Sequence, residues 1–137
     1  MWHHRETGSG RPLILLHGIG MSHAAWNAVT PSLCATRRVI AFDIAGFGLT
    51  PPLPEGTLPT IANLVEGLER SLHEMGLDVP VDMAGNSLGG CMALEAASLM
   101  RWKAAWLYDE GERPWGDVSN GAGQTSRVIV SLNKCPA

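Results

Sequence analysis

The sequence predicts an α/β protein in which helices flank a parallel sheet. Two short, continuous apolar runs, residues 12–16 and 38–43, each end at a glycine-rich turn, which is typical of strands buried on both faces of a sheet. A helical pattern separates the second run from a third, weaker one at residues 80–85. Strands that alternate with helices favour a parallel sheet with right-handed crossovers. We therefore expect residues 12–16 to lie centrally and to pair in parallel with both other runs, which should not pair with each other.

The helical pattern is clearest over residues 61–75. Apolar residues recur there at intervals of three and four, with charged residues between them, which predicts an amphipathic helix. Pro59 suits the first turn of this helix and Gly76 its C-terminal stop. Small and apolar residues predict a second helix over residues 88–100, packed closely on the sheet. Residues 24–36 are expected to contain a third helix, interrupted near its proline.

Length and composition bound the classes of function. A chain of 137 residues has room for one domain with a real core, and 45% hydrophobic against 17% charged residues excludes disorder. The net charge of −3 without a basic stripe disfavours a nucleic-acid partner. No apolar run approaches the roughly 18 residues of a membrane span, and the polar start lacks the apolar stretch of a secretory signal. We expect a cytoplasmic protein without a membrane span.

The cysteine pattern disfavours metal and disulfide frameworks. Cys34, Cys91 and Cys135 are widely spaced, with no Cys-x-x-Cys pair and no Cys/His cluster, so structural zinc and a disulfide scaffold are not predicted. We expect Cys34 and Cys91 to be buried free thiols. Neither a metal nor an organic cofactor is expected.

The pentapeptide Gly85-Asn86-Ser87-Leu88-Gly89 carries the strongest chemical signal. It lies between a predicted strand and a predicted helix of small residues. A serine on so sharp a turn takes a strained backbone conformation, which only small neighbours two residues away accommodate. The turn lifts the hydroxyl clear of the sheet and directs the first N–H groups of the helix at a developing oxyanion. The alternative is an ordinary N-cap serine.

Two further motifs follow the other predicted strands. Residues 17–20 (His-Gly-Ile-Gly) follow the first strand, and residues 43–48 (Asp-Ile-Ala-Gly-Phe-Gly) follow the second. Together with the pentapeptide they make residues 10–100 resemble the α/β-hydrolase family, in its serine esterase-like branch, because order, spacing and strand context agree. The resemblance implies the central strands conventionally numbered three, four and five, with their helices.

The resemblance also implies the residues of an acyl-transfer site. Ser87 corresponds to the nucleophile, and the backbone N–H groups of Ile19 and Leu88 correspond to the oxyanion hole. A serine at this position argues against the dehalogenase and epoxide-hydrolase branches, which carry aspartate there. The glycines of the loop and the elbow are Gly18, Gly85 and Gly89.

The residue that would activate the serine is not evident. The family order is serine, acid, histidine, yet no histidine follows Ser87 in this sequence. His17 is a candidate base, although its family counterpart shapes the oxyanion loop, and Asp43 resembles a residue that holds the turn after its strand. The other histidines have no motif context: His3, His4, His23 and His73. Asp109, Glu110 and Asp117 are among the acidic residues that follow the serine.

Composition shifts near residue 100. Residues 101–137 contain three of the five tryptophans and half of the lysines and arginines, without a sustained helical period. One strand is expected at residues 127–132, after an irregular loop at residues 116–126. We interpret residues 1–100 as a hydrolase-like core. The tail from 101 to 137 is expected to cover the open sheet edge or to be exchanged with a partner.

Taken together, the motifs favour a serine-dependent hydrolase of small-molecule carboxylic esters that forms an acyl-enzyme on Ser87. Without a base such a serine is a weak nucleophile, so we expect slow turnover, and esters rather than amides as substrates. Three explanations stay open. The chain is a truncated or frameshifted homologue that only self-associates, a minimal hydrolase that uses a histidine of its own or of a symmetry mate, or a non-catalytic α/β module. Each leaves an uncovered sheet edge and therefore predicts a homo-oligomer.

Overall fold

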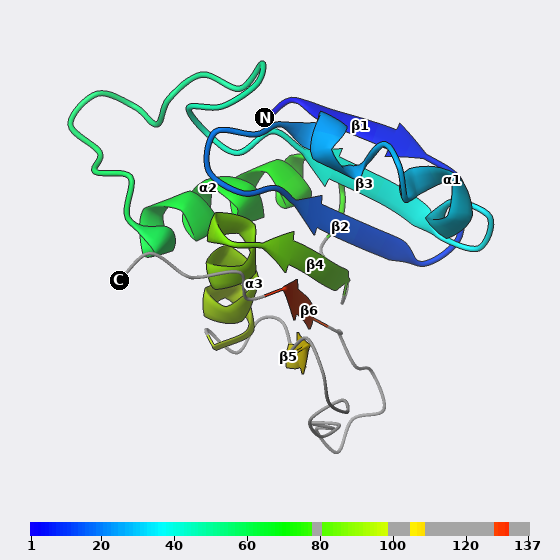
Figure 1. Ribbon diagram of the computed structural model, residues 1–137. Helices are drawn as coiled ribbons and strands as arrows, with labels where there is room; N and C mark the ends of the chain where they lie inside the picture. Colours follow the sequence, from blue (N-terminus) through cyan, green and yellow to red (C-terminus); the bar gives the residue numbers. More distant parts are fainter. Residues whose placement is uncertain (78–80, 99–104, 109–127, 132–137) are drawn as a thin grey trace.

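A single six-stranded sheet organises the computed structural model, which describes residues 1–77, 81–98, 105–108 and 128–131. The strands follow the spatial order β1-β3-β2-β4-β6-β5 (Figure 1). Their bounds are His4–Thr7 (β1), Pro12–Leu16 (β2), Arg38–Phe42 (β3), Asp82–Asn86 (β4), Ala105–Tyr108 (β5) and Val128–Ser131 (β6).

The central pairing is the one that the apolar runs predict. β2 pairs in parallel with β3 on one side, where Ile14 lies opposite Ile40, and with β4 on the other, where Ile14 lies opposite Met83. β3 and β4 are not neighbours. The predicted parallel arrangement with a central first run is therefore confirmed. All three strands run in the same direction, so the loops that follow them lie together at the carboxyl ends of the strands.

β1 is a strand that the sequence analysis did not predict. It pairs antiparallel with β3, with His4 opposite Phe42 and Thr7 opposite Val39. Its residues are polar, and three of the four are exposed. An edge strand with little burial leaves no hydrophobic pattern, so its sequence carries no signal of pairing. The sheet is consequently mixed at this edge.

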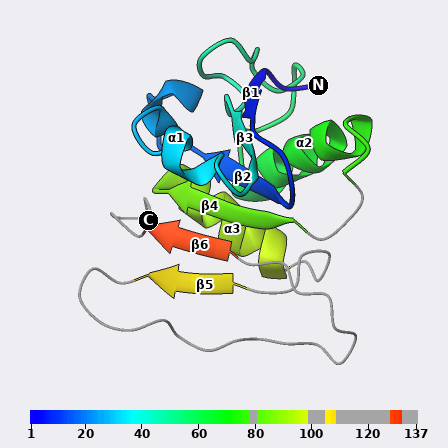
Figure 2. The ribbon, with the colours of Figure 1, turned by 90° about the vertical axis from the view of Figure 1, so that its right-hand side faces the viewer.

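At the other edge the order in space departs from the order in the chain. β6 pairs in parallel with β4, and β5 pairs in parallel with β6, so the later strand lies between the two earlier ones (Figure 2). The strand expected at residues 127–132 is thus found at Val128–Ser131. The loop expected at residues 116–126 lies outside the described residues.

The sheet separates two layers of helices. On one face lie α2 (Ile61–Glu74) and α3 (Leu88–Ser98), and on the other lie the 3₁₀ helix η1 (His23–Trp26) and α1 (Thr30–Leu33) (Figure 2). None of the helices formed by the described residues is long and apolar enough to cross a membrane.

Side chains of the central strand alternate between two hydrophobic clusters. Ile14 and Leu16 belong to the cluster that α2 and α3 close. Leu13 and Leu15 belong to the cluster on the opposite face, which Trp26 partly covers. This alternation explains why the strand reads as a continuous apolar run, because both of its faces are buried.

The two ends of α2 follow from its local sequence. Thr60 is the N-cap, and its hydroxyl accepts a hydrogen bond from the N–H of Asn63. Pro59 therefore lies just before the helix rather than in its first turn. Gly76, at φ +70°, ends the helix as predicted. The N–H of Gly76 donates to His73 and that of Leu77 to Leu72, which is the Schellman arrangement.

The third helix and the cysteines differ from expectation. The segment predicted as an interrupted helix forms two short pieces, and Pro31 stands in the first turn of α1 instead of breaking a helix, because a proline fits that position without losing a hydrogen bond. Cys34 is a free but only half-buried thiol. Cys91 is disulfide-bonded, which corrects the expectation of a free thiol there.

Candidate active site

Ser87 stands on the sharp turn between β4 and α3. Its φ is +52°, and it is the one non-glycine residue with positive φ in the described part of the chain. Such a conformation costs on the order of 1–3 kcal/mol and persists only where the surroundings impose it. The side chain is half-buried. The strained turn predicted from the pentapeptide is therefore present.

The glycines on either side of the turn have no space for a side chain. A Cβ atom on Gly85 would overlap the backbone of Gly89 and Gly90, and a Cβ atom on Gly89 would overlap the carbonyl group of Leu16. The N–H of Gly89 donates to the carbonyl oxygen of His17, with N and O 3.1 Å apart. The start of α3 thus lies directly on the end of β2, and this contact fixes the direction of the serine.

The loop after β2 passes beside the serine. A Cβ atom built on Gly18 would lie 3.5 Å from the Cβ of Ser87 and 3.5 Å from the sulfur of Met21. The N–H of Met21 donates to the carbonyl oxygen of Gly18, which closes a tight turn around Ile19. Among the described residues, the N–H groups of Ile19 and Leu88 have no hydrogen-bond partner. Both are available to a ligand.

His17 is fully buried beneath this loop, and backbone groups occupy both of its ring nitrogens. Nε2 accepts from the N–H of Ile44, 3.0 Å away, and Nδ1 lies 2.7 Å from the carbonyl oxygen of Gly18. An N–H must face an oxygen and a lone pair must face an N–H, so the ring is neutral with its proton on Nδ1. Burial lowers the pKa of His17 and outweighs the opposite effect of the Gly18 carbonyl. These bonds favour a role in shaping the loop over a role as base.

The carboxylate of Asp43, at the carboxyl end of β3, forms hydrogen bonds with three other segments of the chain. It accepts hydrogen bonds from the backbone N–H groups of His23 and Leu49, at 2.6 and 2.9 Å. It also lies 2.9 Å from Nδ1 of His3 and 2.9 Å from Nδ1 of His23. Burial raises the pKa of Asp43, but these hydrogen bonds outweigh burial and hold the pKa well below its usual range. A side chain on Gly48 would overlap this carboxylate, which explains the glycine there.

No histidine of the chain forms a hydrogen bond with Ser87 in the described residues, which include all five histidines. His4 instead lies 3.2 Å from the carbonyl oxygen of Trp2, and His73 is exposed on α2. Among the described residues, the structure therefore brings Ser87 together with Gly18, the loop of Ile19 and the start of α3, but not with a histidine. Three of the acidic residues that follow the serine, Asp109, Glu110 and Asp117, lie outside the described residues.

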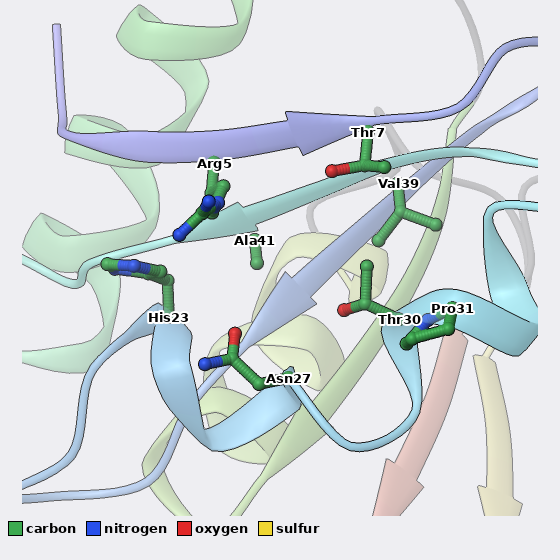
Figure 3. Close-up of a pocket in the computed structure, with 8 residues that line it drawn as sticks. All are labelled: Arg5, Thr7, His23, Asn27, Thr30, Pro31, Val39 and Ala41. Atoms are coloured by element: carbon green, nitrogen blue, oxygen red, sulfur yellow. The ribbon is translucent and has the colours of Figure 1, made fainter.

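A separate cavity of about 250 Å³ lies on the opposite face of the sheet from α2 and α3, between β1, β3 and η1 (Figure 3). Arg5, His23 and Asn27 gather at one end of it, as Figure 3 shows. Sequence reasoning missed this cavity because β1 has no hydrophobic pattern. In addition, the residues that line the cavity are far apart in the chain. Its remaining lining residues are Thr7, Thr30, Pro31, Val39 and Ala41.

Fold and turn geometry agree with comparisons to known proteins. Residues 11–100 match the family described as "alpha/beta hydrolase fold". Since the match covers more than half of the chain, the protein belongs to the α/β-hydrolase family, as its motifs indicated.

Several relatives act as hydrolases or esterases. A 2-hydroxy-6-oxo-2,4-heptadienoate hydrolase of Pseudomonas putida is 40% identical over 95 residues, which are 67% of this chain and 34% of the relative. A pimeloyl-[acyl-carrier protein] methyl ester esterase of Methylococcus capsulatus is 35% identical over 94 residues, 68% of this chain and 34% of that protein. A thermophilic esterase from Thermogutta terrifontis superposes with a TM-score of 0.65 at 30% identity, over 70% of this chain and 35% of its own. The chain spans about a third of the length of these relatives.

Proposed function

We propose that the protein is a serine-dependent hydrolase of small-molecule carboxylic esters and forms an acyl-enzyme on Ser87. The observation that carries the proposal is the strained turn at this serine, which two glycines without room for a side chain enclose. Backbone strain of this kind concentrates at functional sites. A serine that only caps an ordinary helix needs neither a strained backbone nor neighbouring glycines without space for a side chain.

The proposed reaction uses the groups around this turn. Ser87 Oγ attacks the ester carbonyl and releases its proton to water, and the N–H groups of Ile19 and Leu88 hold the negative oxygen of the tetrahedral intermediate. The C–O bond then breaks, the leaving alkoxide takes a proton from water and departs as the alcohol, and the acyl group stays on Oγ. Water attacks the acyl-enzyme, the same N–H groups hold the second oxyanion, and the carboxylic acid is released.

Two exposed apolar side chains indicate the kind of acyl group that would fit. Ile19 is 58% exposed and Met21 is 47% exposed, and both belong to the loop beside the serine. Burying such side chains against an apolar acyl chain is favourable by about 25 cal/mol per Å². We therefore expect the protein to favour esters of short aliphatic acids over charged ones.

The rate is expected to be low in a single chain. No histidine bonds to Ser87, and the oxyanion hole and binding alone give about 10³–10⁴-fold acceleration over water. Good leaving groups depend least on a general acid, so activated esters are the substrates on which turnover is measurable. A base supplied by a second copy of the chain would raise this limit.

Ser87→Ala provides the test on p-nitrophenyl acetate and butyrate. We expect the variant to lose the activity down to the uncatalysed rate, because Oγ is the attacking atom. Ser98→Ala, an exposed serine at the end of the same helix, is the matched control and should retain full activity. Mass spectrometry after treatment with a fluorophosphonate should find one adduct, on the peptide that contains Ser87. Equal rates in the two variants would contradict the proposal.

A second candidate is a non-catalytic member of the family. The observation in its favour is that both ring nitrogens of His17 are occupied by backbone groups, while no other histidine reaches the serine. Single alanine variants of the five histidines separate the cases. One folded variant as inactive as Ser87→Ala identifies a base and a minimal hydrolase. Activity that depends on Ser87 but tolerates all five changes indicates an oxyanion hole acting alone. A wild-type protein without esterase activity supports the second candidate.

A further inference from the structure

We propose that His3, His23 and Asp43 form a binding site for a divalent transition-metal ion, with Zn²⁺ as the reference ion. One ligand atom of each residue lies within 4.8 Å of the others. Successive members of the cluster are 20 residues apart, and His3 and Asp43 are 40 residues apart, so no metal motif exists in the sequence and only the fold brings them together. The site is independent of the chemistry proposed at Ser87.

The three residues come from three different segments. His3 precedes β1, His23 begins η1, and Asp43 directly follows β3. The imidazole rings of His3 and His23 face the same carboxylate, with their centroids 5.2 Å apart. Each ring directs Nδ1 at a different oxygen of Asp43, at 2.9 Å in both cases. Ligand atoms around a zinc ion with bonds of about 2.0–2.2 Å lie about 3.3–3.5 Å apart, so modest side-chain movements admit the ion.

The charge of the site favours a cation. The side chain of Asp43 is fully buried, and among the described residues only the imidazoles of His3 and His23 lie within ion-pair distance of it. Backbone N–H groups already fix the carboxylate in place. A buried carboxylate held in this way acts as an anionic ligand, and two imidazoles with one carboxylate form a donor set that suits zinc, nickel, copper or cobalt rather than magnesium.

Metal binding requires a lone pair at Nδ1 of each imidazole, where the metal–nitrogen bond forms. The proton that each Nδ1 donates to Asp43 passes to water, and Nε2 carries the one ring proton in the bound state. No oxidant or reductant takes part. Water completes the coordination, because the side chain of His3 is 36% exposed and His23 lines the 250 Å³ cavity of Figure 3.

Isothermal titration of the full chain, without a histidine tag, with ZnCl₂ tests the proposal. We expect one equivalent of Zn²⁺ to bind. His3→Ala and His23→Ala should each weaken binding at least about tenfold, as expected for loss of a ligand or its close support. His73→Ala is the matched control, because this histidine is exposed on α2, and its affinity should equal that of the wild type. Circular dichroism verifies that each variant is folded.

Titration with Co²⁺ provides a second readout. A cobalt ion held by two imidazoles and a carboxylate gives visible absorption bands, and these should be absent or shifted in both site variants. Two results would overturn the proposal: no saturable binding of Zn²⁺ up to about 1 mM, or an affinity that His3→Ala and His23→Ala leave unchanged. Weakening by His73→Ala to the same degree would also overturn it, since binding would then be dispersed over surface histidines.

Discussion

His17 and Asp43 are buried polar side chains that directly follow β2 and β3, and they differ in charge because their hydrogen-bond partners differ. His17 has one backbone donor and one backbone acceptor, so its neutral form fits and burial keeps its pKa low. Asp43 has only donors around it, and these keep it charged despite its burial. Both residues order loops that follow the strands, and the loop at His17 carries Ile19.

Replacement of His17 should alter how stability depends on pH. The pKa of His17 is lowered in the folded protein, so its contribution is complete above the unfolded value of about 6.5 and is lost as the pH falls below it. His17→Gln removes this titration, and we expect the free energy of unfolding to fall less between pH 7 and pH 5.5 than in the wild type. At pH 7 the variant should be less stable by about 1–3 kcal/mol, because its hydrogen bonds are imperfect.

Urea denaturation at the two pH values measures both effects. Ser98→Ala serves as the control, because Ser98 is exposed and does not titrate, and its pH dependence should match the wild type. If the free energy of unfolding of His17→Gln fell between pH 7 and pH 5.5 as much as that of the wild type, His17 would not be buried as a neutral ring.

Sequence reasoning reached the serine but not the Asp43 cluster. Ser87 could be predicted because the residues that create its strain are its neighbours in the chain, at positions 85 and 89. His3 and His23 could not be connected with Asp43, because 40 and 20 residues separate the partners. A side-chain cluster of this kind depends on strand order, which local patterns do not determine.

At the scale of elements, the contact between α3 and β2 positions the candidate site. Gly89 lies against the carbonyl group of Leu16, and its N–H donates to His17. The buried strands and both long helices could be predicted because burial imposes periodic apolar residues on them. β1 could not be predicted, and η1 and α1 were predicted only as one interrupted helix, because none of the residues in these three elements is fully buried.

Gly89→Ala tests the α3–β2 contact. The added methyl group would overlap the Leu16 carbonyl, so the helix must move away from the strand. We expect a loss of about 1–3 kcal/mol in unfolding free energy, the usual cost of overpacking, together with loss of the esterase activity. Thermal and urea denaturation measure the first effect. Ser98→Ala at the far end of α3 should change the free energy of unfolding by at most about 0.5 kcal/mol. Equal losses in the two variants would show that the contact between Gly89 and Leu16 does not limit the space at this position.

At the scale of the whole molecule, the sheet has two open edges, β1 and β5, among the described strands. Exposed edge strands offer unpaired N–H and C=O groups to a second chain. Among the described residues of one chain, no histidine forms a hydrogen bond with Ser87. Both features favour association of two copies, which would cover an edge and could supply a histidine to Ser87.

We therefore expect light scattering coupled to size exclusion to find a dimer or larger oligomer at micromolar concentration. Dilution should produce monomer, and specific esterase activity should fall in parallel if the second copy contributes the base. The same dilution series with Ser87→Ala should show the same association without activity, which separates assembly from chemistry. A monomer at all concentrations would contradict this prediction.

The position of β6 between β4 and β5 has a consequence for synthesis on the ribosome. β5 contacts the sheet through β6 alone, although it is translated 23 residues earlier, from Ala105 against Val128. The first four strands can pair as they emerge, whereas Ala105–Tyr108 has no strand to pair with, among those described, until Ser131 has left the exit tunnel. During this interval β4 is itself an edge, and a nascent chain on a neighbouring ribosome can pair with it as readily as its own later strand can.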